Sequence, residues 1–200
     1  MPDDYRLLRR TELPADFGDA LRGLSSDGNA PETLADAVDA LDRLWADANV
    51  TVRQLFQPDG SRHVVDFGDR TEFVPCVLDA VIAAFAVGAD PVEIRSTEPH
   101  TDATVRLTVT DDTVSAEPPT AVFSFGVNAE EVSDPNLSVP EGTDSVVMAF
   151  CSYINAFRDP TAYEAWQHRL TDACAVEIDV ETLSAVAAIA AEEWVTAEPM

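Results

Sequence analysis

The sequence predicts an α+β fold. A small N-terminal helical, winged-helix-like region (residues 1–70) is followed by a core of antiparallel strands packed with helices (residues 71–200). Three observations predict this class. Strand-like segments gather in one stretch, residues 92–125, instead of alternating with helices. Helical patterns flank that stretch on both sides. A hairpin pattern over residues 51–68 follows the first helices, as in a winged helix.

Two amphipathic patterns occupy the N-terminal region. Residues 13–26 (LPADFGDALRGLSS) predict a short helix. Residues 30–49 predict a longer one, because apolar side chains recur there at steps of three and four residues. These side chains are Leu34, Val38, Leu41 and Trp45. The segment TVRQLFQPDGSRHVVDFG (51–68) then predicts strand, tight turn at 58–60, and strand.

The second region opens with a nearly all-apolar helix over residues 75–87 (PCVLDAVIAAFAV). Pro75 suits its first turn and Gly88 suits its end. Because it is apolar on most sides, we expect this helix to be central and buried. Four strand candidates follow, with turn signals at 111–112 and 118–119. They are VEIR (92–95), ATVRLTVT (103–110), TVSAE (113–117) and AVFSF (121–125).

Loop and helix patterns share the remaining residues. Residues 128–144 are polar and contain prolines, so we expect a long surface loop. The apolar segment 145–157 (SVVMAFCSYINAF) fits either a strand or a helix. Two further helices are expected over residues 160–170 and 179–194.

Charge is the strongest compositional signal. The chain has 37 acidic and 12 basic residues, a formal net charge of −25, and every basic residue is arginine. An acidic surface without lysine is typical of salt-in halophilic archaea, where molar salt shortens the Debye length to about 3 Å. The alternative is an acid-rich mesophilic protein. In either case nucleic-acid and anionic-membrane partners are disfavoured, because both need a cationic surface.

Other compositional features concern the compartment. No run approaches the roughly 18 apolar residues of a membrane span, and the N-terminal MPDDYRLLRR lacks an apolar signal core. Three cysteines, an odd number at wide spacing, do not make a disulfide framework. We therefore expect a soluble, reduced, cytoplasmic protein.

Common catalytic and nucleotide-binding motifs are missing from the sequence. There is no CxxC, HExxH, GxSxG, Walker or GxGxxG pattern. Arg158 follows Cys151 one residue too late for a phosphatase-type CX5R loop. His63, His100 and His168 are isolated in sequence, so we expect surface or hydrogen-bonded roles for them rather than metal binding.

Cys76 and Asp79 stand out because they lie three residues apart at the start of the apolar helix. At this spacing both side chains share one helical face. Near the N-terminus of the helix, free amides favour a thiolate on Cys76. A thiolate beside a proton-holding carboxyl group can attack a soft electrophile and then protonate what leaves. The alternative is a buried, inert cysteine, although core packing gives no reason for the acid.

Cys151 is the second thiol that could act, in the apolar segment MAFCSYINAF. If it meets Cys76, the two sulfurs would select a soft metal such as mercury, copper(I) or zinc. Two thiols without histidine partners make a poor structural zinc site, so a thiophilic metal of low coordination number fits better. An inert core role is the alternative for Cys151 too, and we expect Cys174 to be structural.

Two stretches of the chain resemble the organomercurial (alkylmercury) lyases. FVPCVLDAVIAAFAVGADPVEIRSTEPHTDATVRLTVTDD is similar to the Cys-x-x-Asp helix of that family and the strand and turn after it. VVMAFCSYINAFRDPTAYEAW is similar to the family's second catalytic cysteine segment and the Trp-ending helix downstream. The resemblance covers residues 73–125 and 145–195. The cysteine that many members carry in the turn after the first helix is missing from STEPHTD, and Ser152 replaces a second distal cysteine found in some.

This resemblance implies roles for three residues. Cys76 and Cys151 would bind the mercury of an organomercurial R–Hg–X, and Asp79 would deliver a proton to carbon as the Hg–C bond breaks. The products would be R–H and Hg(II), which cellular thiols or a mercuric reductase would collect in mercury detoxification. No dissociable cofactor is implied, since thiols serve as co-substrates. The implied fold is alkylmercury lyase-like, and Phe73, Val77 and Phe150 are candidates to contact the organic group.

Two other functions are compatible with the same residues. The first is a non-enzymatic protein that binds or senses a soft metal (mercury or copper) through Cys76 and Cys151. The second is a metal-independent enzyme with Cys76 as nucleophile, in which Cys151 would be dispensable. Release of hydrocarbon separates the lyase from both.

Overall fold

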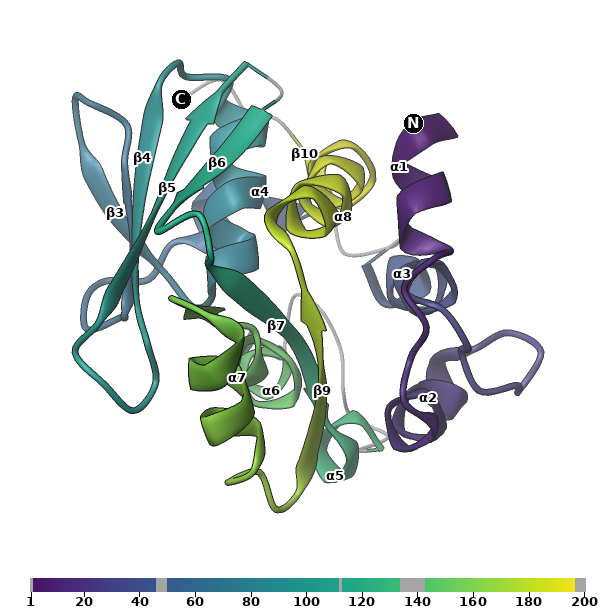
Figure 1. Ribbon diagram of the computed structural model, residues 1–200. Coiled ribbons are helices and arrows are strands. Elements are labelled where there is room, and N and C mark those ends of the chain that lie inside the picture. The colour runs from purple at the N-terminus through teal and green to yellow at the C-terminus, as the bar shows by residue number, and fades with distance from the viewer. Residues whose placement is uncertain (1, 46–49, 112, 134–142, 197–200) are drawn as a thin grey trace.

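The computed structural model describes residues 2–45, 50–111, 113–133 and 143–196. Its strands form two antiparallel sheets and one short parallel pair, with helices packed on them (Figure 1). The fold is therefore α+β with antiparallel sheets, as the sequence predicts. The larger sheet has the order β3-β2-β4-β5-β6. Its strands are β2 (His63–Asp66), β3 (Thr71–Val74), β4 (Val92–Thr97), β5 (Thr104–Thr110) and β6 (Thr113–Glu117).

Two helices cover the inner face of this sheet. They are α4 (Val77–Val87) and α8 (Val180–Glu193), which pack on each other and on the sheet. Buried and exposed residues alternate along β4 and β5, as expected for a sheet with one solvated face. Most of α4 is buried, which confirms the expectation of a central apolar helix. It ends at Gly88, whose φ of 66° is the left-handed conformation that glycine adopts most easily.

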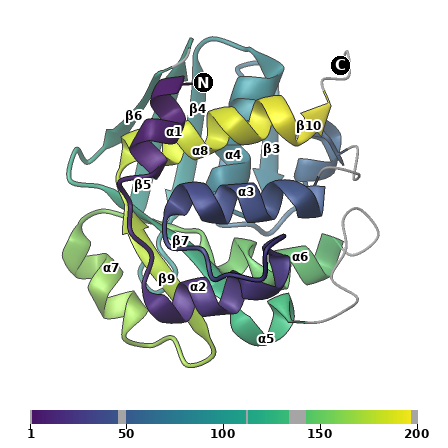
Figure 2. The same ribbon diagram turned by 90° about the vertical axis from the view of Figure 1, so that its right-hand side faces the viewer.

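The N-terminal helices form a further layer on the other side of α8 (Figure 2). They are α1 (Pro2–Leu8), α2 (Ala15–Leu21) and α3 (Leu34–Trp45), with the 3-10 turn η1 (Arg22–Leu24) between the last two. Both α1 and α3 pack on α8, whereas α2 packs on the smaller sheet. The apolar stripe of α3 is buried as its spacing predicts, but the sequence analysis missed α1.

The smaller sheet carries the second half of the site. It has the order β8-β7-β9, with β7 (Val122–Asn128), β8 (Ala156–Phe157) and β9 (Ala173–Ile178). The helix α7 (Pro160–Gln167) packs on it and begins at Asp159, whose side chain accepts a hydrogen bond from the amide of Ala162. The helices predicted over 160–170 and 179–194 are thus present as α7 and α8. The strand β9 was not predicted.

The hairpin predicted over residues 51–68 is wrong in its first half. The strand there is the short β1 (Val50–Thr51), which pairs in parallel with β10 (Val195–Thr196) and not with β2. The next residues form the 3-10 turn η2 (Val52–Leu55), which Thr51 and Gln54 cap through their side chains. The antiparallel partner of β2 is β3, and on its other edge β2 pairs with β4. The boundary at residue 70 therefore falls between paired strands, and the division into regions 1–70 and 71–200 stays a prediction.

The segment before Cys151 is more helical than its sequence indicated. Part of the expected loop at 128–144 is the short helix α5 (Ala129–Val132), and residues 134–142 lie outside the described residues. The undecided segment 145–157 contains the end of α6 (Thr143–Ala149), the 3-10 turn η3 (Cys151–Tyr153) and β8.

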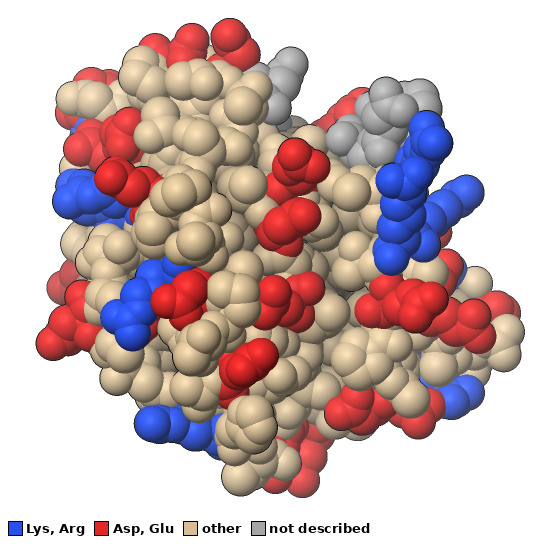
Figure 3. Space-filling model, viewed as in Figure 1, with Lys and Arg blue, Asp and Glu red and all other residues tan. Residues whose placement is uncertain are grey.

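Acidic side chains are spread over the face shown in Figure 3, whereas basic side chains form separate patches. This distribution agrees with the excess of acidic over basic residues. In the described part of the chain, no helix has the length and apolar character needed to span a membrane.

Candidate functional site

Cys76 is the N-cap of α4, where its extended backbone (φ −144°, ψ 169°) turns the sulfur back toward the helix. The amide of Asp79 donates a hydrogen bond to Cys76 Sγ at 3.4 Å. The thiol therefore takes the place of the serine or aspartate oxygen that usually accepts from this position. This corrects the expectation that Pro75 occupies the first helical position, because the helix starts after the residue whose sulfur caps it.

Cys151 reaches the same place from η3, which packs on β7. This packing depends on Gly126 of β7, because a Cβ atom there would lie 2.7 Å from both the Cβ and the carbonyl oxygen of Tyr153. The side chain of Ser124, also in β7, donates a hydrogen bond to the carbonyl of Tyr153 at 2.8 Å. The smaller sheet thus determines where Cys151 lies.

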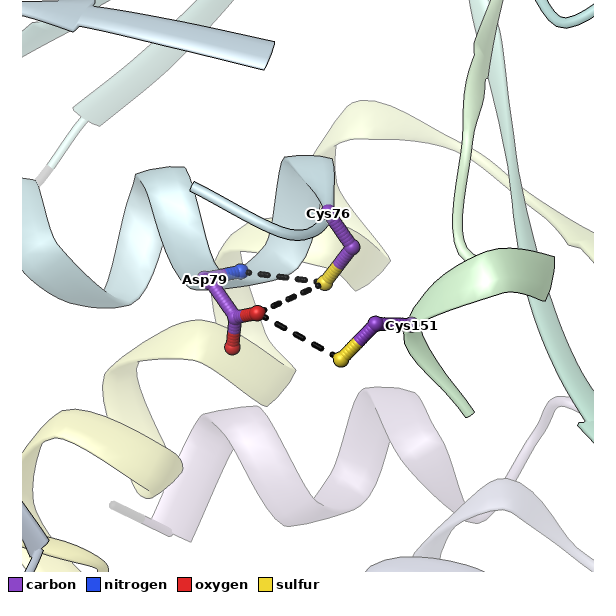
Figure 4. Close-up of side chains that lie close together, drawn as sticks. All are labelled: Cys76, Asp79 and Cys151. Carbon is purple, nitrogen blue, oxygen red and sulfur yellow. Dashed lines mark hydrogen bonds between the residues drawn. The ribbon is translucent and has the colours of Figure 1, made fainter. Parts of the chain in front are cut away.

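The three residues predicted as a site come together at one point (Figure 4). Asp79 Oδ2 accepts hydrogen bonds from both thiols, Cys76 Sγ at 3.2 Å and Cys151 Sγ at 3.5 Å. One ligand atom from each residue lies within 4.8 Å of the other two. Two metal–sulfur bonds of about 2.3 Å, the value for zinc, would span a comparable distance. One soft metal ion can therefore contact both sulfurs.

Burial controls the protonation of this cluster. Cys76 is 1% exposed and Cys151 is 8% exposed. Burial raises the pKa of the Cys76 thiol. The pKa of the Cys151 thiol is raised well above its ordinary value, first by its contact with the Cys76 side chain and then by burial. The expected thiolate at the helix N-terminus is thus wrong for the metal-free site, because loss of solvation outweighs the effect of the helix.

The carboxyl group of Asp79 is also changed by this environment. Burial raises the pKa of its carboxyl group from 3.8 to about 6, against the lowering effect of hydrogen bonds from the two thiols. A carboxyl group with this pKa can accept and return a proton near neutral pH. The sequence expectation that an apolar helix raises its proton affinity agrees with this shift.

A small apolar cavity of about 40 Å³ adjoins the cluster. The residues that line it come from α3, η2, α4, β7, α6 and η3, from positions next to these elements, and from the segment that follows α8. The residues are Leu41, Trp45, Leu55, Cys76, Leu78, Asp79, Ile82, Phe125, Val146, Phe150, Cys151, Ile154, Trp194 and Val195. Phe150 was predicted to contact an organic group and is present, whereas Phe73 and Val77 are not part of the lining. The sequence did not predict that Trp45 and Trp194 line the cavity. Their positions depend on the packing of α3 against the end of α8, which no local pattern shows.

One segment connects the backbones that carry the two cysteines. Ser61 Oγ donates a hydrogen bond to the carbonyl of Val74, two residues before Cys76. The next residue, Arg62, donates to Asn155 Oδ1 at 3.2 Å, and Asn155 Nδ2 donates to the carbonyl of Ser152 at 3.1 Å. Asn155 is fully buried. This network anchors the Cys76 and Cys151 segments to the same short stretch of chain.

The other candidate residues lie outside the cluster. His63 is buried, its Nδ1 is 2.8 Å from Ser96 Oγ, and burial lowers its pKa to about 3. His168 Nδ1 contacts the carbonyl of Glu164, and His100 is exposed. Cys174, on β9, has its sulfur 3.9 Å from the carbonyl of Val127. Among the described residues, Cys76, Asp79 and Cys151 are the only group of three potential metal ligands this close together.

Fold and site together define an α+β protein with two thiols and one carboxyl group gathered at an apolar cavity. The family model of alkylmercury lyase (MerB) matches residues 58–196, well over half of the chain. The chain therefore belongs to the alkylmercury lyase family. Among solved structures, the mercury-bound form of MerB2 is similar with a TM-score of 0.52 and 17% sequence identity, over 96% of this chain and 97% of that one. At this identity the similarity concerns the fold; no curated protein matches the sequence.

Proposed function

We propose that this chain is an organomercurial lyase, which cleaves R–Hg–X by protonolysis to R–H and Hg(II). The observation that carries the proposal is the meeting of two thiols and one carboxylate oxygen at the wall of an apolar cavity. Sulfur ligands select a soft metal, and the carboxyl group supplies the proton that carbon needs. The cavity provides an apolar place for the organic group.

Binding begins with two protonated thiols, because the pKa of each is raised. One sulfur bonds mercury and displaces X, and its proton leaves with X or to solvent. The second sulfur then bonds mercury and gives its proton to Asp79 Oδ2, the oxygen that both thiols contact. Metal binding drives both deprotonations, as it does at other thiolate sites.

Cleavage follows from the position of that proton. Two sulfur donors increase the electron density on mercury and hence on the bonded carbon. Asp79 transfers its proton to this carbon, and the electron pair of the C–Hg bond becomes the new C–H bond. The hydrocarbon R–H leaves, Asp79 is a carboxylate again, and Hg(II) stays bonded to both sulfurs.

Two external thiols complete the cycle. They give their protons to Cys76 and Cys151 and remove mercury as a bis-thiolate, so no dissociable cofactor is needed. Cellular thiols or a mercuric reductase would be the acceptors in a detoxification role, which places the reaction in a reducing cytoplasm. The net charge of −25 without lysine favours assay in multi-molar KCl, as in a salt-in cell.

Headspace analysis of methane from methylmercury, with excess thiol in multi-molar KCl, tests the proposal. We expect release above the thiol-only background. Cys76→Ser and Cys151→Ser should each reduce it to that background, whereas Cys174→Ser, a thiol outside the cluster, should not. Asp79→Ala should keep Hg(II) binding and slow release by about 10²–10⁴-fold, the usual contribution of a general acid.

Two other results would contradict parts of this proposal. Tight Hg(II) binding with no methane from the unmodified chain would contradict the lyase and indicate a soft-metal binding protein. Full methane release from Cys151→Ser would contradict the two-thiol mechanism, because Cys76 would then be sufficient without Cys151.

A further inference from the structure

Two stacked tryptophans form one wall of the cavity. Trp45 ends α3 and Trp194 follows α8, and their rings lie 5.7 Å apart with an angle of 7° between the planes. Both side chains line the cavity that Cys76, Asp79 and Cys151 adjoin. Trp194 is 6% exposed, whereas Trp45 is only partly buried, so the pair extends from the cavity toward the protein surface.

Contacts on either side hold the pair in place. Trp194 Nε1 donates a hydrogen bond to Asp42 Oδ1 at 3.1 Å, one turn before Trp45 on the same helix. The next residue, Val195, pairs with Val50 in the parallel β1–β10 ladder. Trp194 is therefore held through its ring nitrogen and through the residue after it, and Trp45 stacks on this held ring.

The volume of the cavity limits what it can hold. A cavity of about 150 Å³ lined by apolar side chains binds benzene in another protein. The volume here is about 40 Å³. In the same measure a site needs about 10–15 Å³ to hold one water molecule, which is close in size to a methyl group. The cavity therefore accommodates a methyl or ethyl group, and a phenyl group requires the wall to move.

We infer that the Trp45–Trp194 pair restricts the site to mercury compounds with small alkyl groups. This inference rests on the proposed lyase function and names its substrate class. The pair contacts the organic group and not the reacting atoms, because the thiols and Asp79 come from other elements, the start of α4 and η3. Its removal should thus change the ratio of kcat/KM between mercury compounds with large and with small organic groups.

The test measures kcat/KM for methyl-, ethyl-, butyl- and phenylmercury in the unmodified chain, in Trp45→Leu and in Trp45→Phe. The ratio of kcat/KM between two substrates is compared across the variants. The intrinsic reactivity of each Hg–C bond is the same in every variant and therefore cancels in this comparison. We expect the phenyl-to-methyl ratio to rise by about tenfold or more in Trp45→Leu, the scale of size discrimination in apolar pockets. Trp45→Phe keeps an aromatic wall and should lie between. Trp166→Phe is the matched control, because Trp166 packs with Phe157 and Tyr163 away from the cavity.

Equal ratios in the unmodified chain and in Trp45→Leu, with methane still released, would overturn the inference and leave the lyase standing. A failure of the lyase itself would appear as no hydrocarbon from any substrate. If no hydrocarbon is released, calorimetric measurement of organomercurial binding against a competing thiol still tests whether the cavity selects small organic groups. Phenylmercury should bind more tightly relative to methylmercury in Trp45→Leu than in the unmodified chain. An unchanged relative affinity overturns the inference independently of turnover.

Discussion

Asp79→Asn should make the protein more stable at neutral pH. The carboxyl group of Asp79 is 9% exposed, and burial raises its pKa to about 6 in the folded chain, against 3.8 for the ordinary group. Between these values the folded chain binds more protons than the unfolded chain, so folding stability falls as pH rises through this window. A shift of about two units corresponds to about 3 kcal/mol. Asparagine has no charge to desolvate and can still accept hydrogen bonds from both thiols.

Guanidinium or urea unfolding of both proteins at several pH values measures this effect. The variant should gain up to about 3 kcal/mol over the unmodified chain above pH 7, and the gain should shrink toward zero near pH 4. Glu192→Gln, which removes an exposed acid from α8, is the control for loss of a surface charge. A difference between Asp79→Asn and the unmodified chain that stays constant from pH 4 to 8 would refute the reasoning. It would mean that Asp79 is no harder to ionise in the folded chain than in the unfolded chain.

Two further predictions concern the metal site and its support. Hg(II) binding at pH 7.5 should release about two protons per ion, and about one in Cys151→Ser, because both thiols are protonated beforehand. Calorimetry in buffers of different ionisation enthalpy measures this number, and a value near zero would mean that thiolates exist before mercury binds. Gly126→Ala should lower stability by about 1–3 kcal/mol and reduce hydrocarbon release, because the added Cβ displaces Tyr153 and hence Cys151. Thermal unfolding and the methane assay test it, and a variant of unchanged activity would show that η3 adapts without moving the sulfur.

Local patterns were sufficient for the elements that combine strong periodicity with clear ends. The apolar run after Cys76, closed by Gly88, gave α4, and the buried stripe from Leu34 to Leu41 gave α3. Patterns failed where a neighbour decides the conformation. Thr51, Val52 and Phe56 favour a strand, yet residues 52–55 form a 3-10 turn that the side chains of Thr51 and Gln54 cap. The sequence of β9, ACAVEI, lacks the alternation of apolar and polar residues that identifies a strand.

The residues of the site could be predicted from the sequence, whereas their protonation and the lining of the cavity could not. The pair Cys76 and Asp79 has a spacing that places both on one face, and the resemblance added Cys151. Thiolate character at the helix N-terminus was the wrong expectation, since the burial of the Cys76 sulfur cannot be read from the sequence around it. The cavity walls lie more than 100 residues apart in sequence at Trp45 and Trp194 and meet only through tertiary packing.

The β1–β10 pairing has a consequence for synthesis of the chain. Residues 194–196 emerge from the ribosome after every other part of the cavity lining, including both cysteines. Until they arrive, the partner of Trp45 is missing and β1 has no strand to pair with. A nascent chain can therefore gather its thiols around Asp79 while one side of the site is still open. Solvent reaches these sulfurs most easily in that interval, so residues 194–196 also shield the site that they complete.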